Sequence, residues 1–210
     1  PLDYYEVALV REENLNTPPS EWEWEKTQEC RYERQIEDLP EGGYYLVVRG
    51  HNKAGIISRR HLDEWGISEL VVIDYTPPEV LSLEYDSYVA HILKAEVQAK
   101  DKDNLSGIQA YQYALGSLSD PQAFTGGWVD LASRNERVSF QISIDSKSIP
   151  HGSELYLTVR AQDGAGLWSN AKRSAKILVD YTPSTTPEIT CRPFTTSRET
   201  IDGISYSSED

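Results

Sequence analysis

The chain has 210 residues, of which 39% are hydrophobic and 26% charged, a composition typical of folded proteins rather than intrinsically disordered ones. Its formal net charge of −14 disfavours nucleic acids and anionic membranes as partners, because the long-range electrostatic force would be repulsive. No apolar run reaches the roughly 18 residues that a membrane-spanning helix needs, so we expect no membrane insertion.

The first expected strands alternate apolar and polar residues, as half-buried antiparallel strands do. They are DYYEVAL (3–9), RYERQI (31–36) and YYLVVRG (44–50). The same period of two continues downstream and is broken by turn sequences such as NLSG, IPHG and DGAG. The later expected strands cover residues 93–99, 111–115, 138–144, 155–161 and 177–179. Seven short strands in about 100 residues predict a β-sandwich.

The chain repeats itself with a period of about 106–111 residues. YYLVVRGHNKAGIIS (44–58) matches LYLTVRAQDGAGLWS (155–169), and Asp-Tyr-Thr-Pro occurs at 74–77 and again at 180–183. The alignment predicts one complete unit at 77–182. By the same alignment, residues 1–76 lack the opening of a unit.

These motifs resemble the fibronectin type III or Ig-like repeats of large prokaryotic cell-surface and secreted proteins. The resemblance rests on a strand ending Val-Arg-Ala, the turn Asp-x-Ala-Gly, the following Trp-Ser and the Asp-Tyr-Thr-Pro linker, and it covers essentially the whole chain. It implies an all-β fold of tandem antiparallel β-sandwiches joined by short Pro-containing linkers. It also implies an extracellular or cell-surface location. A tyrosine corner is expected at Tyr44, whereas Leu155 takes the matching position in the second unit.

The resemblance divides the chain into a module at 1–76 that lacks strands A and B, a complete module at 77–182, and strands A and B of a third module at 183–210. Strand E, expected near 32–37, would then have no sheet partners, and the first core would lie open on one side. Two alternatives remain. Either the natural polypeptide continues at both ends, or strands from a neighbouring chain complete the first module head to tail and build a filament. Because the chain contains no Met, we expect it to be part of a longer polypeptide.

Oxygen ligands are expected to converge where the first linker meets the second module. This candidate calcium site consists of Asp74, Asp101, Asp103 and Asp163. The alternative is that the aspartates in these turns bond only to their own backbone. No other cofactor is expected. No catalytic nucleophile–base set, phosphate loop or CxxC pair occurs, so we do not expect an enzyme.

Four aromatic residues are candidate interaction sites: Trp24, Trp65, Tyr75 and Tyr181. The two tyrosines lie in the linkers and can pack on a neighbouring module. The two tryptophans lead to an alternative function, an adhesin or a carbohydrate-binding accessory module of a secreted enzyme, with glycans as partners. Otherwise we expect a structural segment of a stalk, fibre, filament or surface layer, whose partners are other copies or modules of the same protein. The sequence does not assign a role to Cys30 or Cys191.

Overall fold

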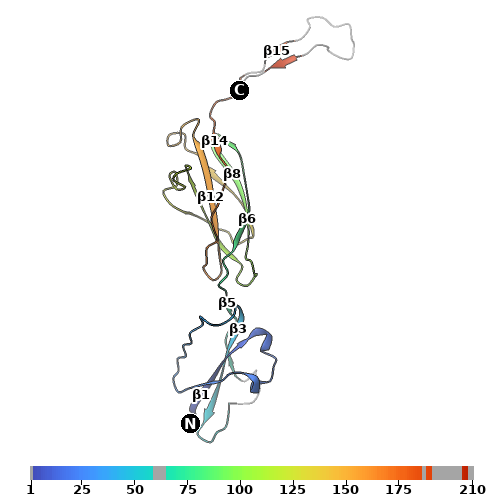
Figure 1. The fold of residues 1–210 in the computed structure, drawn as a ribbon, viewed down its shortest axis with the longest axis vertical. Helices are drawn as coiled ribbons and strands as arrows, with labels where there is room; N and C mark the ends of the chain where they lie inside the picture. Colours follow the sequence, from blue (N-terminus) through green and yellow to red (C-terminus); the bar gives the residue numbers. More distant parts are fainter. Residues whose placement is uncertain (1, 59–64, 186–187, 191–204, 208–210) are drawn as a thin grey trace, which may run out of the picture.

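The computed structural model describes residues 2–58, 65–185, 188–190 and 205–207, and the regular secondary structure of these residues is almost all β-strand. Two units lie end to end, joined by a coil at residues 74–78 (Figure 1). We call β1 to β5 the first unit, β6 to β14 the second unit, and residues 74–78 the linker. Among the described residues, no helix is long and apolar enough to cross a membrane. The expected all-β class is confirmed.

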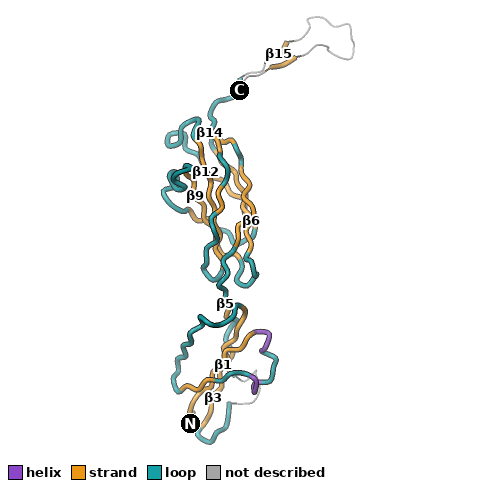
Figure 2. Tube along the Cα trace, viewed as in Figure 1, coloured by secondary structure: helices purple, strands orange, loops and turns teal. Residues whose placement is uncertain are grey.

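The first unit contains a single sheet in the order β2-β1-β3-β4, with β5 also paired to β3. All of its described pairings are antiparallel. Much of the unit outside the two long strands is loop (Figure 2). Its elements are β1 (Leu2–Arg11), η1 (Glu12–Asn14), η2 (Pro19–Glu21), β2 (Glu25–Thr27), β3 (Gly42–Asn52), β4 (Gly66–Ile67) and β5 (Val71–Ile73).

The second unit contains two sheets, one in the order β10-β9-β12-β14-β7 with β13 paired to β12, and one in the order β11-β8-β6. Only the pairing of β14 with β7 is parallel among those described in this unit. Its elements are β6 (Glu79–Tyr85), β7 (Tyr88–Val89), β8 (Ile92–Lys100), β9 (Ile108–Gly116), β10 (Val129–Leu131), β11 (Arg137–Ser143), β12 (Glu154–Asp163), β13 (Lys172–Arg173) and β14 (Ile177–Val179).

One hydrophobic core lies between the two sheets of the second unit. It forms because alternate residues of each strand point inward, as the period of two requires. In β8 the inward residues are at most 5% exposed: Leu93, Ala95, Val97 and Ala99. In β12 the inward residues are fully buried: Leu155, Leu157, Val159 and Ala161.

The first unit buries its main apolar cluster on one face of its only sheet, under the loop that carries Trp22 and Trp24. On the other face, Leu46 and Val48 are only half-buried. The segment expected to form strand E, residues 32–37, contains no strand. The structural reason is that the described residues of the first unit place no strand where β8, the hydrogen-bonding partner of β11, lies in the second unit.

The motif shared by the two units makes the same backbone bonds in each. Ser58 donates its N–H to the carbonyl of Gly50 and accepts the N–H of Gly50 on its Oγ, at 2.7 and 2.9 Å. Ser169 makes the same two bonds with Ala161, at 2.8 and 3.0 Å. The motif therefore encodes a strand end and its following turn, and the serine satisfies backbone groups beyond the ladder.

Beyond the second unit, β15 (Glu188–Thr190) pairs antiparallel with β16 (Ser205–Ser207). Most of the segment expected to supply strands A and B, residues 183–210, lies outside the described residues, as does Cys191. The division of the chain into modules stays a prediction.

Candidate metal centre between the two units

Carboxylates from both units meet at the linker. Asp74 begins the linker, and Glu41 lies just before β3. Because Gly42 pairs with Ile73 in the sheet, the next residues outward along the two strands, Glu41 and Asp74, come side by side. Carboxylate oxygens of these two residues and of Asp103, in the second unit, all lie within 4.8 Å of one another.

Two further aspartates approach from inside the second unit. Asp101, 2% exposed, follows β8, and Asp163, fully buried, ends β12. Asp101 and Asp103 are close enough for a hydrogen bond if one of them is protonated, and the charges of Asp74 and Asp101 both act on Asp163. Of the four predicted residues, the structure thus brings Asp74 and Asp103 within mutual ligand distance and places Asp101 beside Asp103. Asp163 lies within range of the charges of Asp74 and Asp101, without a shown position among the ligand atoms.

The two loops of the second unit that carry these aspartates are interlocked. Gly164 donates its N–H to the carbonyl of Gly107 at 3.0 Å. A Cβ at position 164 would lie only 2.5 Å from the carbonyl oxygen of Ser106, so only glycine permits this approach. Asn104, which follows Asp103, supports the tight turn after β8 with a left-handed φ of 60°. The close contact at Gly164 and this turn fix the relative positions of the two loops that carry Asp101, Asp103 and Asp163.

Hydrogen bonds tie the linker to both units. Asp74 accepts the hydroxyl of Ser106 on one oxygen and the N–H of Thr76 on the other. Glu41 accepts the N–H of Tyr75 at 2.6 Å and the hydroxyl of Thr76 at 2.9 Å. Sequence reasoning missed Glu41 and Ser106. The signal for Glu41 was its position directly before the strand whose first residue, Gly42, pairs with the residue before Asp74.

The electrostatics of the cluster favour neutralisation of its carboxylates. Burial raises the pKa of Asp163, and the negative charges of Asp74 and Asp101 raise it further. The hydrogen bond from the N–H of Leu167 lowers it, but by less. Loss of hydration likewise raises the pKa of Asp103, assisted by the same two neighbours. A carboxyl whose pKa is raised is one whose negative charge lacks sufficient compensation.

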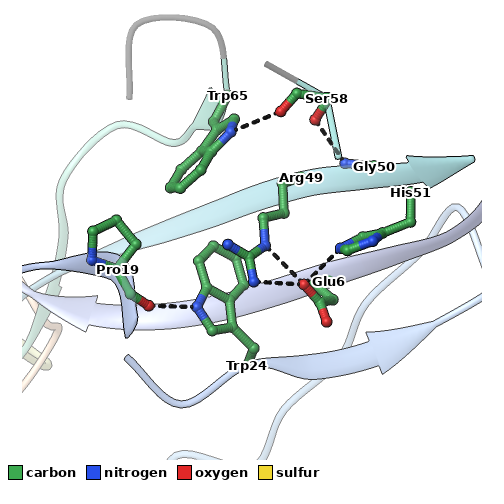
Figure 3. Close-up of polar contacts among 8 residues, drawn as sticks. All are labelled: Glu6, Pro19, Trp24, Arg49, Gly50, His51, Ser58 and Trp65. Atoms are coloured by element: carbon green, nitrogen blue, oxygen red, sulfur yellow. Dashed lines mark hydrogen bonds and ion pairs between the residues drawn. The ribbon is translucent and has the colours of Figure 1, made fainter. Parts of the chain in front are cut away.

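The tryptophans Trp24 and Trp65 do not form a free aromatic platform. Figure 3 shows the guanidinium of Arg49 over the ring of Trp24, with its Cζ 3.8 Å from the centroid of Trp24 and 5.4 Å from that of Trp65. The two indole N–H groups donate to the carbonyls of Pro19 and Ser58. In the second unit, Arg160 also contacts two tryptophans, with its Cζ 4.2 Å from each centroid: Trp128 and Trp168.

The carboxylate of Glu6 forms an ion pair with the guanidinium of Arg49 (Figure 3). Its Oε2 accepts from Nε and Nη2 of Arg49 and lies 2.7 Å from Nε2 of His51. Burial by itself would raise the pKa of Glu6, but the hydrogen bonds from His51 and Arg49, with their charges, bring it below its ordinary value. This cluster is a buried packing motif of the first unit, and Gln112 takes the place of Glu6 beside Arg160.

No family model matches the chain, and no curated protein does. Among solved structures, a DUF3823 family protein from Bacteroides ovatus ATCC 8483 is similar at 14% sequence identity, over 85% of this chain and 90% of that chain, with a TM-score of 0.36. At this level the likeness supports no functional conclusion, so the function is argued from the geometry of the chain itself.

Proposed function

We propose that this chain is a structural segment of an extracellular stalk, fibre or surface layer, built from tandem Ig-like or fibronectin III-like β-sandwich modules on short Pro-containing linkers. The observation that carries the proposal is that the same joint is built twice. At the first joint, the hydroxyl of Tyr75 donates to the carbonyl of Ile36 at 2.7 Å, its N–H donates to Glu41, and the N–H of Thr76 donates to Asp74.

The second joint has the same pattern of contacts. The hydroxyl of Tyr181 donates to the carbonyl of Ile149 at 2.9 Å, its N–H donates to His151, and the N–H of Thr182 donates to Asp180. In each case the linker tyrosine is bound to the unit that precedes it. A linker that is anchored over three residues and continues into proline restricts the angles at which the next module can lie. Restricted joints suit a spacer that must keep its length.

The alternative glycan-binding role requires aromatic faces that a sugar can stack on. The rings of Trp24 and Trp65 pack against Arg49 and against each other, with centroids 5.6 Å apart, so their contact surfaces serve the fold. The hydroxyl of Tyr85 likewise makes a contact within the fold, because it accepts a hydrogen bond from the N–H of Ala175. These contacts favour the structural role. Retention of the chain on a polysaccharide gel, lost on Trp24→Ala, would instead favour glycan binding.

Strand complementation fits the same proposal. The half-buried face of the first sheet forms a hollow of about 340 Å³ between the two long strands and the segment near Cys30, lined in part by Leu46 and Val48. The corresponding positions of the second unit, Leu157 and Val159, are fully buried by a second sheet. We propose that strands from a second copy cover this face. Sedimentation velocity should then show association that rises with concentration and is weakened by Val48→Asp, but not by Ile56→Asp at a residue that is 64% exposed.

Small-angle X-ray scattering tests the joint. The full chain should give the profile of a rod of fixed bend, whereas replacing residues 74–78 by Gly-Ser-Gly-Ser-Gly should give a distribution of shapes. Tyr75→Phe, which keeps the ring and removes only one hydrogen bond, is the matched mild variant. A wild-type chain as flexible as the Gly-Ser variant would contradict a structural spacer.

A further inference from the structure

The cluster at the linker contains two buried carboxylate oxygens without partners. Oδ2 of Asp101 accepts the N–H groups of Ser106 and Gly107 at 3.0 and 2.7 Å, but its Oδ1 has no hydrogen-bond partner. Oδ1 of Asp163 accepts the N–H of Leu167 at 2.8 Å, and its Oδ2 has none. Leaving a buried charged oxygen unpaired is costly, so a native structure needs a reason for each one.

The turn at Asp163 does not itself need a carboxylate. In the first unit the same turn is made by Asn52, whose amide oxygen accepts the N–H groups of Ala54 and Ile56 at 2.9 and 3.0 Å. A neutral side chain therefore satisfies this backbone geometry. The negative charge and the second oxygen of Asp163 are surplus to the turn.

Within the described residues, no ion pair joins a Lys, Arg or His to any of the five carboxylates Glu41, Asp74, Asp101, Asp103 and Asp163. Five like charges in a partly buried site repel one another unless protons or a bound cation neutralise them. The unpaired oxygens of Asp101 and Asp163 add to the uncompensated negative charge next to Asp74 and Asp103.

We propose that the junction binds a calcium ion between Glu41, Asp74 and Asp103, whose carboxylate oxygens lie within 4.8 Å of one another, while the unpaired buried oxygens of Asp101 and Asp163 add negative charge behind the ion. The cluster offers only oxygen donors, without the cysteine or histidine ligands that zinc and copper prefer. Its carboxylates come from several separate loops, which suits the six to eight oxygens and irregular geometry of calcium better than the strict octahedron of magnesium.

The proposed ligands belong to both units, so ion binding would fix the angle between them. Glu41 and Asp74 come from the first unit and its linker, and Asp103 comes from the second unit. An ion bound by both sides favours the arrangement in which both sets of ligands can reach it. The role of the ion in stiffening the joint rests on the proposed structural function. The calcium site itself rests only on the geometry of the carboxylates.

The second joint provides a natural comparison. There His151 lies in the position of Glu41 and accepts the N–H of Tyr181 on its Nδ1, while Asp180 lies in the position of Asp74. The nitrogen of His151 is a poor ligand for calcium, which prefers oxygen. The substitution Glu41→His therefore copies a residue that this chain already uses at the same place in a joint, and it removes one proposed ligand without touching a core.

Isothermal titration calorimetry of the full chain with CaCl2, at constant ionic strength and after chelator treatment, tests the site. We expect one saturable event with a Kd of about 10⁻⁴ to 10⁻³ M, the range of extracellular calcium modules. MgCl2 should bind at least about tenfold more weakly. Glu41→His and Asp101→Asn should each weaken calcium binding about tenfold or more, and Glu84→Gln, an exposed acid outside the cluster, should leave it unchanged.

Circular dichroism of each variant checks that it is folded, and Glu41→His keeps the test valid should Asp101→Asn unfold. No heat at 10 mM calcium would overturn the proposal, and so would equal affinity in wild type and Glu41→His. The two proposals fail separately. A joint that stays flexible with calcium bound contradicts the structural spacer, whereas a stiff joint without calcium binding contradicts only the ion.

Discussion

The carboxylate of Glu6 should contribute to the stability of the first unit in a way that depends on pH. It is 8% exposed and is bonded to Arg49 and His51 at 2.7 Å. Hydrogen bonds to charged groups contribute about 1.5–3 kcal/mol, and removing one partner of a buried ion pair costs about 3–5 kcal/mol. Glu6→Ala should therefore lower the free energy of unfolding of this unit by about 3–5 kcal/mol at pH 7.

Glu6→Gln should cost less, about 1–2 kcal/mol, because an amide oxygen still accepts from the guanidinium. The second unit already uses that arrangement, in which Gln112 accepts from Nε and Nη2 of Arg160 at 3.0 and 2.6 Å. Glu6→Gln thus gives the first unit the pairing found in the second. It removes the charge and retains the hydrogen bonds to Arg49.

The pH dependence separates charge from packing. The pKa of Glu6 is below its ordinary value of 4.5 in the folded chain, so its contribution is complete above that value and is lost as the pH falls through the folded pKa. The difference between wild type and Glu6→Gln should accordingly be full at pH 7 and shrink below about pH 4.5. Urea unfolding followed by the NMR signals of β1 amides measures it, with β12 amides as the internal control. A difference that stays constant from pH 7 to pH 3 would refute the reasoning.

Two further substitutions test local features. Tyr44→Phe removes the 2.7 Å hydrogen bond from the tyrosine hydroxyl to the carbonyl of Pro40. Urea unfolding should show that the free energy of unfolding of the first unit falls by about 0.5–1.5 kcal/mol, and an unchanged value would argue against the tyrosine corner. Gly164→Ala places a methyl group 2.5 Å from the carbonyl oxygen of Ser106. Thermal unfolding should show that the free energy of unfolding of the second unit falls by about 1–3 kcal/mol, whereas no change would mean that the two loops are not in close contact.

The strands of the second unit were predictable because each one satisfies its pattern locally. In residues 93–99 every apolar residue is buried, since a strand between two others in a sandwich exposes alternate residues to the core. The hydrogen bond of Tyr44 was also predictable, and it is confirmed. Residues 31–36 have a similar pattern without forming a strand, because a strand needs a partner and the described part of the first unit offers none at that position. Periodicity alone cannot detect a missing partner.

The acidic cluster was only partly visible in the sequence. Asp101, Asp103 and Asp163 lie in turns that the fold class brings to one end of the unit, and Asp74 lies in the linker that enters there. Glu41 depended on sheet register, which the sequence does not specify until the partner of Gly42 is known. The packing of Trp24 on Arg49 was not predictable either, because it depends on how a loop crosses the outer face of the sheet.

The stiffness of the joint is the property on which the proposed function most depends, and pulsed electron–electron spin resonance measures it most directly. One nitroxide on exposed Cys30 and another on Ser146→Cys, with Cys191→Ser, would report the distance between the two units in the full chain. Anchored linker contacts on both sides predict a single narrow distance distribution, no broader than that of a label pair within one unit. A broad distribution of distances in wild type, equal to that of the Gly-Ser linker variant, would contradict a spacer of fixed length.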